Sequence, residues 1–208
     1  RDVAPSRGLG DVYKRQEQEV EFAVGEYEPA LSLQIWKSYA DIFSIRITHP
    51  SGKTVGIIRQ LQGPQRFTIE GTQVLLYFGE PSPFSPFQEI YFDFLPVENY
   101  IDSGIYKITL IPEKIVTGAY NMWLPSLAVI GEATGFLYPT EETTLTIPST
   151  AYKVISVGAY DARYNQVAAF SGRGFTRETN QVKPDICAPG VDLSLIHISE
   201  PTRRSYIS

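Results

Sequence analysis

The feature that most constrains this chain is a period of two in its apolar residues, which runs from Ala30 to about Pro125. Leu31, Leu33 and Ile35, for example, alternate with Ser, Gln and Trp. Successive side chains of a strand point to opposite faces, so this alternation predicts strands that bury one face. Nothing in the block has the length and period of a helix.

Turn signals such as Gly63-Pro64 and Asp102-Ser103-Gly104 divide this block into short segments. The expected strands are residues 31–36, 42–48, 54–59, 66–70, 73–78, 89–95, 105–111 and 120–124. The 13 Tyr and 11 Phe, together with 16 Gly and 15 Pro, also favour strands joined by turns. Strands this short, separated by frequent turns, predict an antiparallel sandwich or barrel, of which a jelly roll is the simplest form.

The pattern changes after about Phe136. Val154–Tyr160 is a nearly uninterrupted apolar run, which suits a strand buried on both faces in a parallel sheet. Two short β-prone segments and two loops accompany it: residues 143–147, 167–170, 171–180 and 183–191. The expected fold class is therefore mixed β and α/β, with an antiparallel sandwich followed by an incomplete α/β part without helices.

Composition excludes several function classes. The formal net charge of −5 argues against a nucleic-acid partner, and Gly, Pro and polar residues interrupt every apolar stretch that could span a bilayer. One Cys excludes an internal disulfide framework. The two histidines, His49 and His197, leave almost no room for a His-based metal site.

The two ends of the chain continue none of these patterns. Both GLGDVYKRQ near the start and SLIHISEPTR near the end resemble translated sequencing-adapter text, and we interpret the end segments as non-native. The expected divisions are residues 1–16 (non-native), 17–138 (jelly-roll sandwich), 139–193 (incomplete α/β part) and 194–208 (non-native). Residues 17–193 alone carry 12 basic and 20 acidic residues, a net charge of −8, and one His.

Three ordered motifs near the end resemble the subtilisin-like serine proteases, family S8. They are VISVGAYD (Val154–Asp161), AAFSGRG (Ala168–Gly174) and VKPDICAPGVDL (Val182–Leu193). The resemblance implies a parent hydrolase that cleaves protein or peptide substrates with an Asp-His-Ser triad and an oxyanion-stabilising Asn.

Three further segments resemble the jelly-roll insert of a clostridial subgroup that includes the Csp-type spore-germination proteases. They are Ser32–Trp36, Ser103–Leu110 and Tyr120–Pro125. In that subgroup the triad Asp and His and the Asn precede the insert, and the Ser follows the last motif. The resemblance therefore implies that no catalytic residue lies within residues 17–193, and that this fragment is inactive. It also implies an extracellular, cell-envelope or spore-associated bacterial protein, whose missing protease parts are its partners.

The resemblance assigns a substrate-binding role to Thr146, Ile147, Pro148 and Ser149, which match one wall of the S1 pocket. In many relatives the matching proline is cis, so we also consider a cis Ile147–Pro148 bond, against a general cis frequency of about 5–6% of X–Pro bonds.

Carbonyl groups near Ser149, Ala151 and Val154 match a weak monovalent-cation or calcium site in some relatives. No cofactor is otherwise required. The residues assigned to structural motifs are Ser171, Gly172, Arg173, Gly174, Lys183, Pro184, Asp185, Pro189 and Gly190. Among these, Gly172 and Gly174 are expected to take positive φ, and Pro189-Gly190 to form a tight turn. Arg173 is expected either in an ion pair or carbonyl contacts, or in solvent.

Residues that look catalytic have simpler interpretations. His49 lies in a Thr-His-Pro-Ser-Gly turn, which predicts an exposed histidine. Ser171 resembles a nucleophile elbow but lacks its first Gly, and in the family it is structural. Cys187 is expected as a small buried packing residue. Asp161 and Asp185 are expected as turn and loop residues.

Two alternatives remain open from the residues. The first is a free-standing jelly roll that binds carbohydrate or peptide through exposed aromatics such as Trp36, Tyr39 and Trp123, or a pseudoprotease. The second is a purely structural sandwich. A binding module does not account for the three ordered motifs near the end of the chain.

Overall fold

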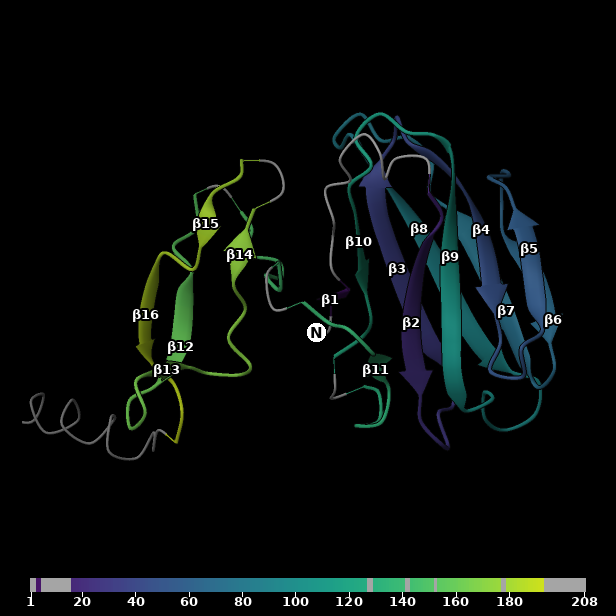
Figure 1. The fold of residues 1–208 in the computed structure, drawn as a ribbon. Coiled ribbons are helices and arrows are strands. Elements are labelled where there is room, and N and C mark those ends of the chain that lie inside the picture. The colour runs from purple at the N-terminus through teal and green to yellow at the C-terminus, as the bar shows by residue number, and fades with distance from the viewer. Residues whose placement is uncertain are drawn as a thin grey trace, which may run out of the picture. The chain divides into compact units, whose positions relative to one another are not determined.

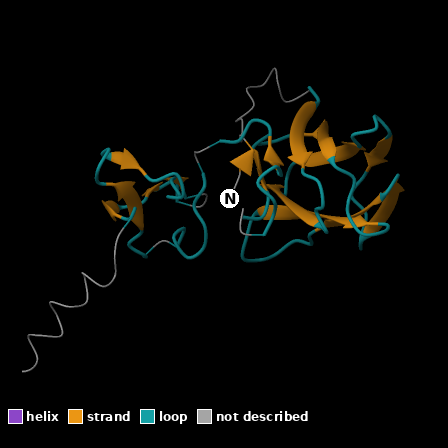
Figure 2. Cartoon of the chain, turned by 90° about the horizontal axis from the view of Figure 1, so that it is seen from below, coloured by secondary structure: helices purple, strands orange, loops and turns teal. Residues whose placement is uncertain are grey.

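The structure is a computed structural model that describes residues 3–4, 16–126, 129–140, 143–151, 153–176 and 179–192 (Figure 1). The chain forms two compact units, residues 1–140 and residues 141–208. The described residues form strands and loops, with no helix among them (Figure 2). It follows that none of them makes a helix of the length and apolar content that a membrane crossing requires.

The first unit contains two antiparallel sheets. In order across the first sheet, the strands are β1 (Val3–Ala4), β10 (Tyr120–Trp123), β3 (Leu31–Ser38), β8 (Phe87–Pro96), β7 (Thr72–Phe78) and β6 (Gln65–Ile69). Across the second they are β11 (Gly135–Phe136), β2 (Gln18–Val24), β9 (Gly104–Lys114), β4 (Ile42–Thr48) and β5 (Thr54–Ile58).

The strand order is that of a jelly roll. Eight strands form the two four-stranded sets β1-β10-β3-β8 and β2-β9-β4-β5, in which the chain crosses repeatedly between the sheets. The β6–β7 hairpin extends the first set beyond β8, and β11 extends the second set beyond β2. All eight strands expected from the alternation are present.

The core lies between the two sheets. Along β3, residues alternate strictly between buried and half-buried, as the period of two predicts. Phe22 of β2 packs edge-on against Phe94 of β8, with ring centroids 5.6 Å apart, and stacks on Tyr106 of β9 at 5.5 Å. These rings come from both sheets, so they join the two layers directly.

Two strands, β1 and β2, lie before Ala30, where the alternating block was expected to begin. In β2, Val20, Phe22 and Val24 point towards the core, although the expected block starts at Ala30. The backbone of Val3–Ala4 pairs with β10, so these two residues belong to the sheet, in a segment that the sequence analysis left outside the fold.

The second unit contains two small sheets. In one, β12 (Val157–Asp161) pairs in parallel with β16 (Ile186–Pro189) and antiparallel with β13 (Gln166–Val167). In the other, β14 (Gly174–Phe175) pairs with β15 (Val182–Lys183). The parallel pair follows the expectation for the apolar run, but the described part of this unit holds no helix that would make it α/β.

Three expectations for the second unit are wrong. Residues 143–147 form a turn and coil where a β-prone segment was expected. Val157 of β12 is 59% exposed and the preceding Ile155 is 74% exposed, so the strand is not buried on both faces. The loop expected around Lys183 contributes two strands, β15 and β16, because its backbone pairs with β14 and β12.

Candidate functional site

The second unit is organised around a buried lysine. Lys183 is 4% exposed, and its Nζ donates to the carbonyl oxygen of Val154 and to Oδ2 of Asp185, each at 2.6 Å. Oδ2 of Asp185 also accepts the backbone N–H of Ser156 at 2.7 Å. These two hydrogen bonds, the first from Lys183, lower the pKa of the Asp185 carboxyl. The lysine and aspartate therefore tie β15 and the start of β16 to the segment before β12.

The segment that the resemblance assigns to the S1 wall is exposed. The Ile147–Pro148 bond is cis, as considered from the sequence, and the Ile147 side chain is 88% exposed. The carbonyl of Pro148 accepts the N–H of Ala151 at 2.9 Å, and that of Ser149 accepts Oγ of Ser156 at the same distance. The role of Thr146–Ser149 in binding substrate stays a prediction.

The carbonyls assigned to a cation site do not fit a free cation. The Val154 oxygen already accepts the Lys183 ammonium. The Ser149 oxygen accepts a hydroxyl, and that of Ala151 accepts the Val154 N–H at 3.3 Å. Within the described ranges, no group of three or more His, Cys, Asp or Glu side chains could hold a metal ion. The cation site at these carbonyls stays a prediction.

The Phe-Ser-Gly-Arg-Gly motif makes structural contacts. Oγ of Ser171 accepts the N–H of Ala159 at 2.9 Å, which joins the motif to β12. The carbonyl of Arg173 accepts the backbone N–H groups of Thr143 and Thr144, both at 3.0 Å. These bonds involve the main chain of Arg173, so the role of its side chain stays a prediction. No histidine occurs in the described part of this unit to activate Ser171.

The glycines of the motifs are required for different reasons. Gly174 has φ +135°, as expected. Gly172 does not have positive φ; a Cβ there would lie 2.9 Å from the carbonyl oxygen of Thr144, so close approach excludes a side chain. Gly190 is likewise limited by space, since its Cβ would meet that of Ala159 at 2.7 Å.

Two further expectations about this region are corrected. Pro189 is the last residue of β16 and pairs with Tyr160 of β12, so Pro189-Gly190 extends a strand and does not form a tight turn. The Cys187 side chain is exposed, not buried, because β16 has no sheet neighbour on its other side among the described residues.

The two aspartates considered as a carboxylate pair lie apart. Asp161 ends β12 and forms an ion pair with Arg163 at 3.3 Å, whereas Asp185 precedes β16, whose first residue pairs with the first residue of β12. Because β12 and β16 are parallel, the two carboxylates lie near opposite ends of the pair. Asp161 belongs to β12 and pairs with Gln166 of β13, so the expectation of a turn residue is wrong; the hydrogen bonds from Arg163 lower the pKa of its carboxyl.

A buried histidine cluster lies in the first unit. His49 is 4% exposed, which overturns the expectation of an exposed turn residue. Its Nε2 lies 2.9 Å from Oδ2 of Asp102, and its Nδ1 lies 2.9 Å from Oγ of Ser51. Nδ1 also accepts the backbone N–H of Ser51 at 3.1 Å, so the ring proton sits on Nε2 and is donated to Asp102. Sequence reasoning missed the cluster because Asp102 lies 53 residues away.

The cluster contains Ser51, His49 and Asp102, which are the residue types of a hydrolase triad. Its contacts, however, join loops to one another, and we call it a loop clamp. Asp102 also accepts the N–H of Gly71 at 2.8 Å and the hydroxyl of Thr72 at 3.3 Å. It therefore joins the β4–β5 turn, the β6–β7 turn and the β8–β9 loop. Ser51 lies two residues from His49 in an exposed turn, and we assign the cluster a structural role.

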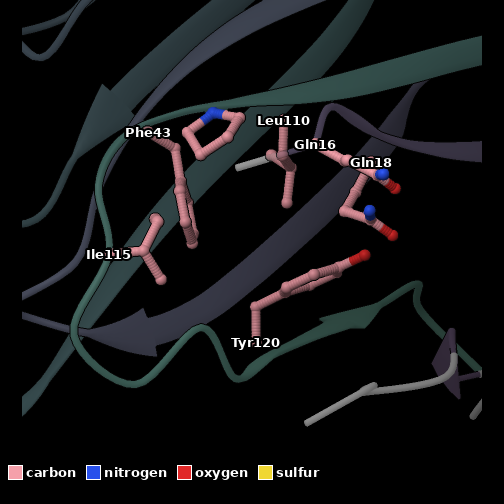
Figure 3. A pocket seen from close by; sticks show the side chains of 7 residues that line it. Gln16, Gln18, Phe43, Leu110, Ile115 and Tyr120 are labelled. Carbon is pink, nitrogen blue, oxygen red and sulfur yellow. The ribbon is translucent and has the colours of Figure 1, made fainter. Parts of the chain in front are cut away.

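A pocket opens at one end of the sandwich (Figure 3). It is lined by Gln16, Gln18, Phe43, Leu110, Pro112, Ile115 and Tyr120. The volume that water can enter is about 10 Å³, which suffices for about one water molecule. This pocket is too small for a peptide or sugar.

Comparison with known proteins gives a family match and matches to solved structures. Residues 136–208 match the model of the subtilase family, Peptidase_S8. A solved structure described as the CspB protease of Clostridium perfringens matches with a TM-score of 0.76 and 31% identity, covering 84% of this chain and 36% of that one. No curated protein sequence matches the chain. The family match extends over residues 194–208, which the sequence analysis interprets as non-native and which lie outside the described residues.

These matches agree with the motifs and the fold. Residues 136–208 are similar to the subtilase family, and most of the chain is similar in structure to the CspB protease. The chain spans about a third of the length of the CspB protease that it matches.

Proposed function

We propose that the chain is an interior part of a subtilisin-like serine endopeptidase whose catalytic Asp, His, Asn and Ser come from other parts of the parent protein. In this proposal the first unit is a jelly-roll insert that steadies the peptidase domain, and the second is an incomplete α/β portion of that domain. The segment by itself does not hydrolyse peptide bonds.

The observation that carries the proposal is a structural match that covers most of the chain. The match to the CspB protease covers 84% of this chain, whereas the family match begins at residue 136. A free-standing jelly roll would not explain why the second unit contains the three subtilase-like motifs. The described residues also support inactivity, since the second unit offers Ser171 no histidine and the Ser51 cluster is a loop clamp.

A fluorophosphonate probe tests inactivity directly, because it labels activated serines. The full 208-residue chain is expected to remain unlabelled and to leave casein intact. Labelling that maps to Ser51 or Ser171 and is lost in Ser51→Ala or Ser171→Ala would refute the proposal. The exposed Ser82→Ala variant serves as a control for non-specific reaction.

Recovery of the full-length gene tests the parent. We expect an Asp and a His-Gly-Thr sequence upstream, a Gly-Thr-Ser sequence downstream, and fluorophosphonate labelling of that serine in the expressed protein. A full-length protein without these residues, or with the serine replaced, would instead be a pseudoprotease. Its protein substrate is not defined by this segment.

A second candidate, a binding module, is favoured by one observation on the first sheet. Trp123, Gln34, Tyr91 and Tyr77 oppose one another in turn across β10, β3, β8 and β7, and so form a row on the outer face. Trp36 lies on the same face, next to Glu89. Aromatic rings beside polar groups are typical of surfaces that bind sugars or peptides.

This second candidate is tested with cello-, xylo- and chito-oligosaccharides and unstructured peptides, using calorimetry on the full chain. If the row binds ligand, Tyr91→Ala should weaken binding about tenfold or more. Tyr27→Ala removes an aromatic ring that lies outside the row and should have no effect. Absence of binding to any of these probes eliminates this candidate.

A further inference from the structure

We propose that the ammonium group of Lys183 replaces a bound cation in the second unit, so that an internal charge, and not Ca²⁺, Na⁺ or K⁺, holds this unit together. The proposal does not depend on peptidase activity. It rests on the oxygen atoms around Nζ and on the segments that they connect.

The oxygens around Nζ are of the kind that hard cations bind. A backbone carbonyl, from Val154, and a carboxylate oxygen, from Asp185, both lie 2.6 Å from Nζ. Carbonyl and carboxylate oxygens are the usual ligands of Ca²⁺. Lys183 is 4% exposed, so its charge is withdrawn from water and depends on these two partners.

The contact joins segments that are distant in sequence. Val154 and Lys183 are separated by 29 residues, and Asp185 also accepts the backbone N–H of Ser156. The N–H of Asp185 donates back to the carbonyl of Ser156 at 3.0 Å. These bonds lie directly before the paired residues Val157 and Ile186, so they set the register at the start of the parallel pair.

A second cation cannot share this place. It would compete with Nζ for the Val154 and Asp185 oxygens, and the two positive charges would repel each other at close range. The carbonyls of Ser149 and Ala151 are also engaged, by a hydroxyl and an N–H group of the protein. The arrangement is thus complete without an ion.

Reversal of the charge should convert the place into a true cation site. Lys183→Glu would put a second carboxylate beside Asp185 and free the Val154 carbonyl, which together provide the ligand types that Ca²⁺ prefers. Lys153→Glu is the matched control, because Lys153 is exposed and the change in charge is the same.

The measurement is hydrogen–deuterium exchange of peptides that cover residues 154–160 and 183–189 in the full chain, with and without about 5 mM Ca²⁺ or about 100 mM K⁺. We expect less than about a twofold cation effect on the wild type and on Lys153→Glu. In Lys183→Glu without cation, protection should fall about tenfold or more, and Ca²⁺ should restore most of it. Calorimetry should detect Ca²⁺ binding to this variant alone.

Several results would overturn the proposal. They are cation-dependent protection of the wild type, absence of any protection of these peptides in the wild type, or a Lys183→Glu variant that is protected and insensitive to Ca²⁺. If Lys183→Glu remains unprotected even with Ca²⁺, Lys183→Met is the deciding variant. The proposal requires that Lys183→Met loses protection of these peptides. If Lys183→Met without a cation is protected as well as the wild type, the proposal is refuted.

Discussion

The two units of this chain are stabilised in different ways. Of the 26 buried hydrophobic residues in the described ranges, 25 lie in the first unit, and only Ala168 lies in the second. Both units bury polar groups, but in the second unit Lys183, Ser156 and Thr176 are buried with almost no apolar core around them. Apolar burial is non-directional, whereas buried polar groups must each find a partner. We therefore expect the first unit to fold alone and the second to depend on a few specific bonds.

Limited proteolysis should give the largest difference between the units. We expect a protected product near residues 20–135, and cleavage within residues 141–192 about a hundredfold faster, because local opening costs little without an apolar core. Mass spectrometry of the time course measures both rates. Equal protection through residue 190 would contradict the comparison.

Phe22→Ala tests the core of the first unit. Phe22 is fully buried against rings from both sheets, so its truncation should lower the free energy of unfolding by about 3–5 kcal/mol. Urea titration followed by the fluorescence of Trp36 and Trp123 reports on this unit alone. Phe170→Ala, at a 71% exposed position of the second unit, should change this transition by less than about 0.5 kcal/mol.

Asp41→Ala asks whether the first unit also depends on a buried polar group. The Asp41 carboxylate is fully buried and accepts the backbone N–H groups of Val116, Thr117 and Gly118 at 2.6–2.9 Å. Three unpaired donors would remain, so the same urea titration should show a loss of about 2–4 kcal/mol. Glu98→Ala, at an exposed position, should be nearly neutral. If Asp41→Ala leaves the free energy of unfolding unchanged, apolar burial alone stabilises this unit.

Tyr106→Phe tests the hydrogen bonds that support the loop clamp around Asp102. The Tyr106 hydroxyl donates to the carbonyl of Asp102 at 2.9 Å and contacts the Thr72 hydroxyl at 3.0 Å, and burial raises its pKa to about 12. Loss of the hydroxyl should cost about 1–2 kcal/mol in the urea transition. Tyr77→Phe, at an exposed position, should cost almost nothing.

Lys37 gives the most specific effect, because only the pH dependence of stability reports it. Burial lowers its pKa from the ordinary 10.5 to about 8, although the charge of Asp41 opposes the shift. Between these two pH values the unfolded chain binds more protons, so the free energy of unfolding should rise with pH across this window. The rise is measured as the difference between wild type and Lys37→Met in urea titrations from pH 7.5 to 10.5. If this difference in the free energy of unfolding does not change with pH, the pKa of Lys37 is not lowered in the folded state.

The same contrast explains how far the sequence could predict the structure. The alternation of Leu31, Leu33 and Ile35 is local, and it predicted β3 because one buried face is enough to produce it. Val20, Phe22 and Val24 alternate equally well, but they lie between glutamates next to text that we interpret as non-native, and β2 was missed. Sheet edges such as β1 leave no such pattern.

The candidate site was predicted less completely, because its contacts are not local. The Lys-Pro-Asp motif marked Lys183 and Asp185 as structural, but no pattern indicated that Nζ would reach the carbonyl of Val154. Carbonyl groups carry no side-chain signature. The predictions for His49 and Cys187 were wrong for a related reason. The burial of His49 depends on Asp102, and that of Cys187 depends on the neighbours of β16. The local sequence of each residue specifies neither.

The pairing of β11 with β2 has a consequence for how such a unit enters a host protein. Phe136 lies opposite Phe22, and the N–H of Leu137 donates to the carbonyl of Glu21, so the departing chain runs back beside the arriving one. Adjacent strands lie about 4.8 Å apart. A host loop therefore needs to open by no more than the width of a hairpin to admit the whole sandwich. If the sandwich is an insert, as proposed above, we expect it to tolerate transfer to a hairpin loop of another host protein.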